Sequence, residues 1–183
     1  MMSKRQILLS ITAILCFFCF SYLYADYGLR PGAQAPFFRV ISGEGKVLTL
    51  EDIKGKAVGI FYETTDVVRQ NIQLKEELGG YYDGQPEPVK NMIMRLPVIN
   101  CSKVFRPLAG IWRAQFRKHS KKEGIIIYGD WNGRMFSDYN IQDGVSNVFL
   151  IDKKGSIRYY AAGTLDAKER GRIISLLKTL VAE

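Results

Sequence analysis

The sequence predicts an α/β domain in which helices cover both faces of a mixed β-sheet. From residue 46 onward, apolar β-branched runs typical of strands alternate with amphipathic runs typical of helices. Strands separated by helices favour parallel pairing, whereas the turn at 153–155, between two apolar runs, predicts a closing antiparallel hairpin. We therefore expect parallel βαβ units with an antiparallel edge.

The N-terminal part of the domain contains three predicted elements. Residues 27–39 include Pro31, Gly32 and Pro36, so we expect an extended segment followed by a turn at 42–45 and a strand at 46–50. The run at 57–62 is apolar almost throughout, as in a central strand buried on both faces. The segment 66–78 is predicted to be a helix, capped by Thr65 or Asp66 and stopped by Gly79 and Gly80.

The remaining elements follow in the order strand, helix, strand, hairpin and helix. We expect strands at 96–100, 124–128, 148–152 and 157–161, and a helix at 107–120 behind Pro107. The C-terminal helix is the clearest, because Asp166 and Glu169 have capping-box spacing and an apolar stripe runs from Ile173 to Val181.

Length and composition restrict the class of protein. The chain has 183 residues, a net charge of +8, 47% hydrophobic residues, one His and three Cys. This fits one globular domain and excludes a disordered, collagenous or multi-span membrane protein. A zinc cage would need nearly every candidate ligand in the chain, so we expect no metal site and no cofactor.

Residues 1–25 have the features of an export signal. Lys4 and Arg5 precede an apolar run, and Ala25 offers a small residue for cleavage. We expect a periplasmic domain at 26–183, or, if the segment is uncleaved, a domain anchored to the inner membrane. Membrane contact is expected only in the uncleaved case. Removal of the signal leaves Cys101 as the sole thiol, so the domain cannot form an internal disulfide.

Three stretches together resemble a thioredoxin-like (redoxin-type) domain. They are the strand–turn–strand region at 46–62, the Phe149-Leu150-Ile151-Asp152 strand with its Gly155 turn, and the terminal helix that follows. The resemblance spans about residues 30–183 and implies a three-layer thioredoxin-like fold. Within this fold the chain most resembles the YtfJ-like family of periplasmic proteins. Matching features are Pro97–Asn100, the basic helix after it, and the stretches 128–133 and 146–155.

The resemblance also implies that the redox site is degenerate. Redoxins carry Cys-x-x-Cys after the buried strand, where this chain has Thr64, Thr65, Asp66 and Arg69. They also carry a cis-proline where this chain has Ser146. We therefore expect a redox-inactive binding or accessory module and no enzyme. The competing interpretation is a single-cysteine thiol oxidoreductase or peroxidase that uses Cys101, whose thiolate Lys103 and Arg106 would favour if it were exposed.

The stretch 89–122 contains nine basic residues and no acidic one. Arg113 and Arg117 are i, i+4 neighbours on the predicted helix and would form a positive ridge beside Trp112 and Phe116. An exported protein is not expected to bind nucleic acid. The candidate partner is therefore an acidic protein or an anionic envelope surface, and a solvated basic face is the alternative. The candidate binding residues are Arg113, Arg117, Lys118, Lys121 and Lys122.

Overall fold

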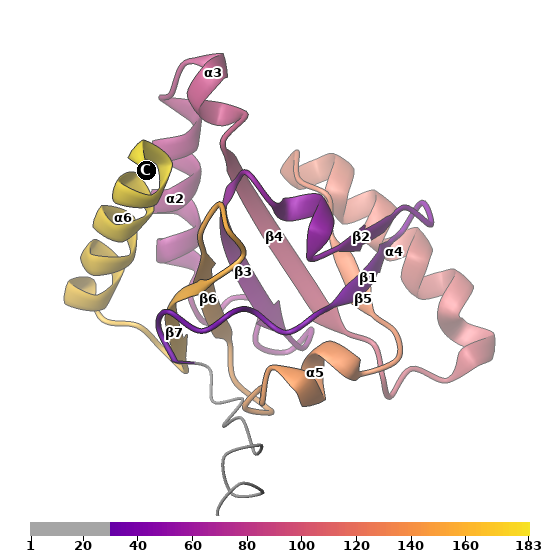
Figure 1. Ribbon diagram of the computed structural model, residues 1–183. Coiled ribbons are helices and arrows are strands. Elements are labelled where there is room, and N and C mark those ends of the chain that lie inside the picture. The colour runs from indigo at the N-terminus through magenta and orange to yellow at the C-terminus, as the bar shows by residue number, and fades with distance from the viewer. Residues whose placement is uncertain (1–29) are drawn as a thin grey trace, which may run out of the picture.

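The computed structural model describes residues 30–183, which form a seven-stranded sheet in the order β2-β1-β5-β4-β3-β6-β7 (Figure 1). The signal expected at 1–25 lies outside the described residues. Pairing is parallel for β3–β4 and β4–β5 and antiparallel elsewhere, which confirms the predicted mixed sheet. The strands are β1 (Arg39–Ser42), β2 (Val47–Thr49), β3 (Ala57–Glu63), β4 (Ile93–Asn100), β5 (Tyr128–Asp130), β6 (Asn147–Ile151) and β7 (Ile157–Ala162).

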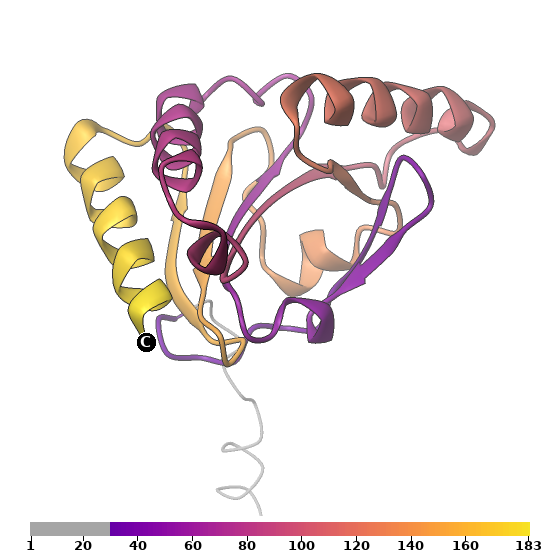
Figure 2. The ribbon, with the colours of Figure 1, turned by 90° about the horizontal axis from the view of Figure 1, so that it is seen from above.

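Helices cover both faces of the sheet, as predicted. They are η1 (Glu51–Ile53), α2 (Ile72–Asp83), α3 (Glu87–Lys90), η2 (Arg106–Leu108), α4 (Ala109–Glu123), α5 (Arg134–Asp138) and α6 (Ala167–Ala182). Figure 2 shows α6 and α2 next to each other on one face and α4 farther along the same face, with α5 and η1 against the other. The core is correspondingly divided between the two faces of the sheet.

The central strand is β3, as the apolar run predicts. All seven of its residues are buried, and it pairs with β4 on one side and β6 on the other. Both faces of β3 therefore pack against helices. The strand ends at Glu63, which places the following residues at the carboxyl edge of the sheet.

The helix predicted at 66–78 is displaced in the structure. Residues 65–71 form turns, and α2 begins at Ile72 and continues through Gly79 and Gly80 to Asp83. The predicted glycine stop is wrong because Tyr81 and Tyr82, just beyond it, pack against the core and favour continuation. The predicted cap is also wrong, since Asn71 occupies the N-cap position and its side chain makes no capping bond.

Other differences concern short elements whose formation depends on distant partners. The strand expected at 124–128 begins only at Tyr128. Strand β1 lies between the expected extended segment and the expected turn and was not predicted, and neither was the five-residue α5. Strand β4 begins three residues before the expected strand.

The C-terminal hairpin and helix are confirmed. Asp152 Oδ1 accepts bonds from the N–H groups of Lys154 and Ser156, and Gly155 adopts a φ of 85°, which glycine adopts without strain. Asp166 caps α6 by accepting the Glu169 N–H at 2.8 Å. Such a cap contributes about 1 kcal/mol.

Candidate functional site

The carboxyl ends of β3 and β4 meet at one edge of the sheet and bring Thr64 close to the region of Cys101. Thr64 is half-buried, whereas Thr65, Asp66 and Arg69 are exposed. The pKa of Asp66 is lowered, chiefly by the neighbouring Thr64 side chain and by its own backbone N–H. The structure thus makes these four residues a surface turn rather than a helix start.

Beneath this turn lies a buried ion pair that the sequence analysis missed. Glu63 is 2% exposed, and both its carboxylate oxygens accept bonds from Lys75 Nζ, at 2.8 and 2.6 Å. Ser146 is fully buried, and its hydroxyl donates to Glu63 Oε1 at 2.7 Å. Its N–H donates to the side chain of Gln70. The signal in the sequence was the single charge that ends the apolar β3 run, since a buried charge requires a partner.

Among residues 30–183, no cysteine lies in this corner. The chain does contain Cys-x-x-Cys spacing at Cys16 and Cys19, but both residues fall outside the described part. The buried network instead ties β3, α2 and the residue before β6 together. Within residues 30–183, Cys101 is therefore the thiol to consider.

Cys101 follows β4 directly and is 1% exposed. It packs with Ile99 and Phe116 of α4, and its N–H donates to the Asp130 carbonyl at 3.0 Å. Burial, and secondarily the charge of Asp130, raise the pKa of the thiol to about 12. The expectation that Lys103 and Arg106 would favour the thiolate is not met in this conformation, because the thiol is covered and Lys103 pairs with Asp143.

A pocket of about 400 Å³ lies over this cluster. Two of its lining residues, Val104 and Trp112, also pack against the cluster that contains Cys101, so the thiol lies about one side-chain layer beneath the pocket. The pocket extends to Thr64, and thus connects the surface turn with the region above the thiol. Its lining residues are Thr64, Asn100, Lys103, Val104, Phe105, Leu108, Trp112 and Asp143.

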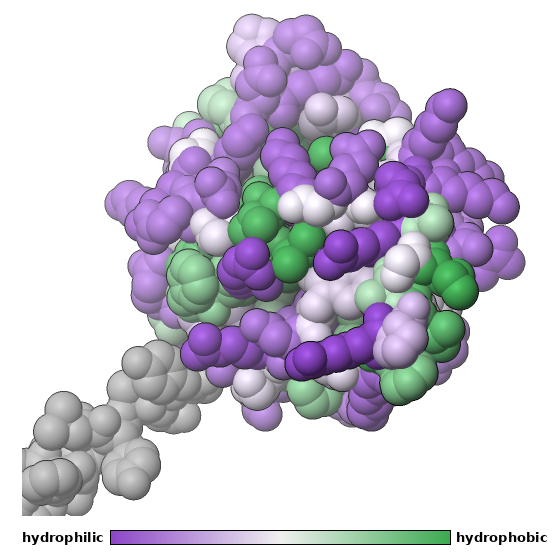
Figure 3. Space-filling model, turned by 90° about the vertical axis from the view of Figure 1, so that its right-hand side faces the viewer, coloured by the Kyte–Doolittle hydropathy of each residue, from purple (hydrophilic) through white to green (hydrophobic). Residues whose placement is uncertain are grey.

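The surface beside the pocket is apolar. The side chains of Phe105, Leu108 and Ile111 are 69%, 45% and 60% exposed. Large exposed apolar side chains that adjoin a cleft are typical of interaction sites. Figure 3 shows the side of the molecule that carries α4 and the β1–β2 hairpin, where hydrophobic patches interrupt a largely hydrophilic surface.

The five candidate basic residues all lie exposed on α4, but two of them also have structural contacts. Arg117 Nη1 donates to the Gly43 carbonyl at 2.8 Å, and the Arg113 guanidinium lies 5.4 Å from the Trp131 ring centre. Among residues 30–183, Lys118 and Lys121 show no such contact, and Lys122 approaches the exposed Glu123 at 3.5 Å. The two arginines therefore attach α4 to the sheet edge, and the three lysines carry the positive charge that remains available to a partner.

Asp130 is a second buried carboxylate at this edge. Its Oδ2 accepts bonds from the Tyr62 hydroxyl and the Phe136 N–H, both at 3.0 Å. Its Oδ1 has no hydrogen-bond partner among the described residues. Nothing local in the sequence indicates that Asp130 is fully buried.

Comparisons with known proteins place this geometry in the thioredoxin-like fold. The sequence matches no family model and no curated protein. A candidate thiol-disulfide oxidoreductase from Bacteroides vulgatus is 25% identical, with a TM-score of 0.60 over 83% of this chain and 97% of that one. A candidate thiol:disulfide interchange protein DsbE from Chlorobium tepidum is 16% identical, with a TM-score of 0.63 over 84% and 99%.

An exposed lipoprotein thioredoxin from Streptococcus pneumoniae is 18% identical, with a TM-score of 0.53 over 79% of this chain and all of that one. Proteins outside the cytoplasm are thus among the similar structures. Within residues 30–183, none of the helices is long and apolar enough to cross a bilayer.

These comparisons contradict our expectation of a redox-inactive accessory module that is no enzyme. The similar structures are described as thiol-disulfide oxidoreductase and interchange proteins, which accords better with the competing interpretation based on Cys101. The error has a physical cause. The missing dithiol at the helix start excludes one mechanism, whereas exchange through a single thiol requires only one sulfur that can become exposed.

Proposed function

We propose that the protein is an exported thiol–disulfide oxidoreductase of the single-cysteine type, with Cys101 as its reactive thiol. The observation that carries the proposal is the position of Cys101 at the carboxyl end of β4, directly beneath a pocket that reaches Thr64. The thiol thus lies one side-chain layer beneath a cavity large enough for part of a substrate.

The reaction proposed is disulfide exchange without net oxidation. The Cys101 thiol loses its proton to solvent, and the thiolate attacks one sulfur of a substrate disulfide. The Cys101–substrate bond forms, the substrate S–S bond breaks, and its other sulfur leaves as a thiolate that takes up a proton. A second thiol of the same substrate then attacks the mixed disulfide and releases Cys101. One disulfide and the same number of thiols are present before and after, so the step needs no separate oxidant.

The thiol must be uncovered before it reacts. With a pKa of about 12, the buried thiol is protonated at neutral pH. Displacement of Val104 and Trp112 would admit water and lower the cost of ionisation, because burial is the main cause of the raised pKa. An apolar polypeptide segment that binds Phe105 and Leu108 would favour this opening, and we propose such a segment as the substrate.

The proposal also includes the family of the protein and its location in the cell. We propose membership of the YtfJ-like proteins and a periplasmic location, supported by the motifs at 97–100 and 146–155 and by the export features of residues 1–25. Mass spectrometry of the exported protein should find Asp26 at the N-terminus. An intact Met1 or Met2 would instead indicate an anchored protein.

The test uses the full-length chain in detergent, with Cys16 and Cys19 replaced by Ser so that Cys101 is the one remaining thiol. This protein should accelerate isomerisation of scrambled ribonuclease, and the further substitution Cys101→Ser should abolish the acceleration. Labelling of Cys101 by iodoacetamide should occur at denaturant concentrations far below the unfolding midpoint. Activity that survives Cys101→Ser, or labelling that requires global unfolding, would refute the proposal.

A further inference from the structure

The parallel pairing of β4 with β5 covers only the end of β4. Val98–Asn100 pair with Tyr128–Asp130, so the β4 residues before Pro97 pair on the β3 side alone. The Met92 carbonyl faces β3, where it accepts the Ala57 N–H. Since backbone groups alternate in direction along a strand, the N–H and C=O groups of Ile93 and Arg95 face the unpaired side. This part of β4 is a free sheet edge inside the molecule.

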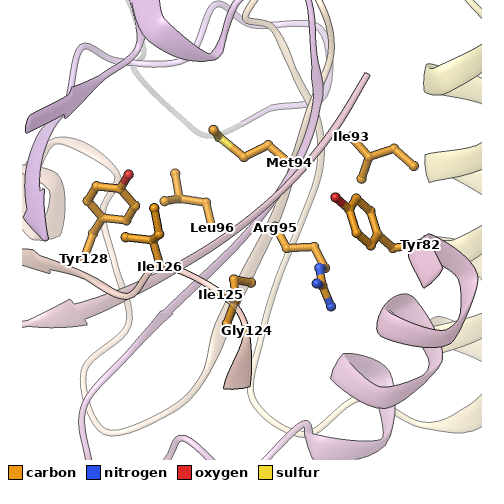
Figure 4. A pocket seen from close by; sticks show the side chains of 9 residues that line it. All are labelled: Tyr82, Ile93, Met94, Arg95, Leu96, Gly124, Ile125, Ile126 and Tyr128. Atoms are coloured by element: carbon orange, nitrogen blue, oxygen red, sulfur yellow. The ribbon is translucent and has the colours of Figure 1, made fainter. Parts of the chain in front are cut away.

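A cleft of about 210 Å³ opens along this edge. It lies between residues 93–96 of β4, the segment Gly124–Ile126 that diverges from the sheet, and Tyr82 of α2 (Figure 4). Its volume is below the roughly 300–1,000 Å³ typical of small-molecule pockets. It suits one or two residues of an extended chain better than a whole ligand.

The charge of the cleft is unbalanced. The Arg95 guanidinium lies 4.6 Å from the Tyr82 ring centre, and Figure 4 shows the two side chains approaching each other from β4 and α2. Arg95 is only half-exposed, yet among residues 30–183 no carboxylate forms a salt bridge with it. Lys90 lies over the same ring at 5.8 Å but pairs with the exposed Glu87 at 3.4 Å, so Arg95 carries the uncompensated charge. Partly buried arginines normally pair with an anion.

We propose that this cleft binds an extended polypeptide segment that carries a carboxylate. The segment adds to the free edge of β4 through the backbone groups of Ile93 and Arg95, and its carboxylate pairs with the Arg95 guanidinium. Main-chain bonds to a sheet edge supply affinity, and the side-chain pair supplies selectivity for an acidic residue. The site is separate from Cys101 and does not depend on thiol chemistry.

The experiment measures binding of the blocked pentapeptide acetyl-Val-Thr-Glu-Val-Thr-amide to the full-length chain in detergent, by amide chemical shifts of Ile93 and Arg95. A Gln version of the peptide should bind about tenfold or more weakly, because it loses the charge-assisted bond. Arg95→Gln should remove this preference for Glu. The matched variant Arg39→Gln, at an exposed position on β1, should keep it.

Strand addition is tested by N-methylation of the peptide. Methylation of the residues that face β4 should abolish binding, while methylation of their neighbours should not. Equal binding of all methylated peptides, or displacement by sodium acetate alone, would show a simple anion site and overturn the proposal, as would no binding at millimolar peptide. The Cys101→Ser protein should bind the Glu peptide unchanged, so failure of the thiol mechanism and failure of this site are distinguishable.

Discussion

Lys75 Nζ lies 2.6 Å from Oε2 of Glu63, and this ion pair is the centre of the corner formed by β3, α2 and Ser146. Glu63 is almost completely enclosed, while the Lys75 side chain keeps 24% exposure. A carboxylate buried in this way requires its cation, because hydrogen bonds from Lys75 and Ser146 replace the water that would otherwise solvate it.

Lys75→Met should therefore destabilise the domain strongly. The substitution leaves the Glu63 carboxylate buried without its cation, which costs about 3 kcal/mol. The matched control is Lys54→Met, which breaks the exposed pair with Glu51 and should cost at most about 1 kcal/mol. Urea unfolding of both variants checks the difference. Similar midpoints would mean that Glu63 is not held by Lys75.

Gly59 tests the burial of β3. Gly59→Asp places an unpaired carboxylate inside the core and should lower the free energy of unfolding by several kcal/mol. Gly59→Ala should be tolerated, because the added Cβ would lie 3.7 Å from the Leu150 side chain, an ordinary contact. The two variants are compared by thermal unfolding. If Gly59→Asp were as stable as Gly59→Ala, the strand would have an exposed face.

Alanine substitutions at Gly129 and Gly171 should have opposite effects on stability. A Cβ at Gly129 would lie 2.7 Å from Trp131 Nε1 and 3.0 Å from Cys101 Sγ, so Gly129→Ala should cost about 1–3 kcal/mol through overpacking. Gly171 lies exposed inside α6 with open space around it, and Gly171→Ala should stabilise by about 0.5–1 kcal/mol. Calorimetry should show opposite shifts in Tm, and shifts of the same sign would contradict this packing.

The raised pKa of Cys101 predicts instability at alkaline pH. The unfolded chain releases the thiol proton near pH 9, whereas the folded domain retains it up to about pH 12. In this window the unfolded state binds fewer protons, so stability falls as pH rises, by about 1.4 kcal/mol per pH unit for this group. Burial also raises the pKa values of Tyr62 and Tyr139, which steepens the fall above pH 10.

Urea unfolding between pH 8 and 11 measures this dependence. The Cys101→Ser protein should show a shallower fall than the wild type over the same range, whatever its stability at pH 8, because one of the groups with a raised pKa is gone. An identical slope in both proteins would show that the thiol ionises as freely in the folded domain as in the unfolded chain.

Binding to an acidic partner or an anionic surface remains a prediction. We expect the exposed lysines of α4 to form the binding surface. Reversal of Lys118, Lys121 and Lys122 to Glu should weaken binding to poly-glutamate, and added salt should weaken the wild-type binding, since exposed charges are screened over about 8 Å at physiological ionic strength. Arg117→Glu should also reduce stability, because it loses the bond to Gly43. Salt-insensitive binding that survives the lysine reversals would exclude this face.

The sequence by itself determined the features that arise from local chemistry. The mixed α/β class, the hairpin between β6 and β7 and the capping of α6 by Asp166 follow from residues a few positions apart, and the structure confirms them. The apolar run of β3 likewise identified the central strand without knowledge of its neighbours.

The tertiary structure decided the features that depend on contacts between distant residues. The start of α2 is one, because the Asn71 side chain bonds to Gly163 and Leu165, about ninety residues away. The pairing of Glu63 with Lys75 and Ser146, and the covering of Cys101 by Phe116, are others. Periodicity and spacing describe which face of an element is apolar, but the partner that covers it is selected by packing of the whole chain. For that reason the sequence could identify the thiol but not its environment.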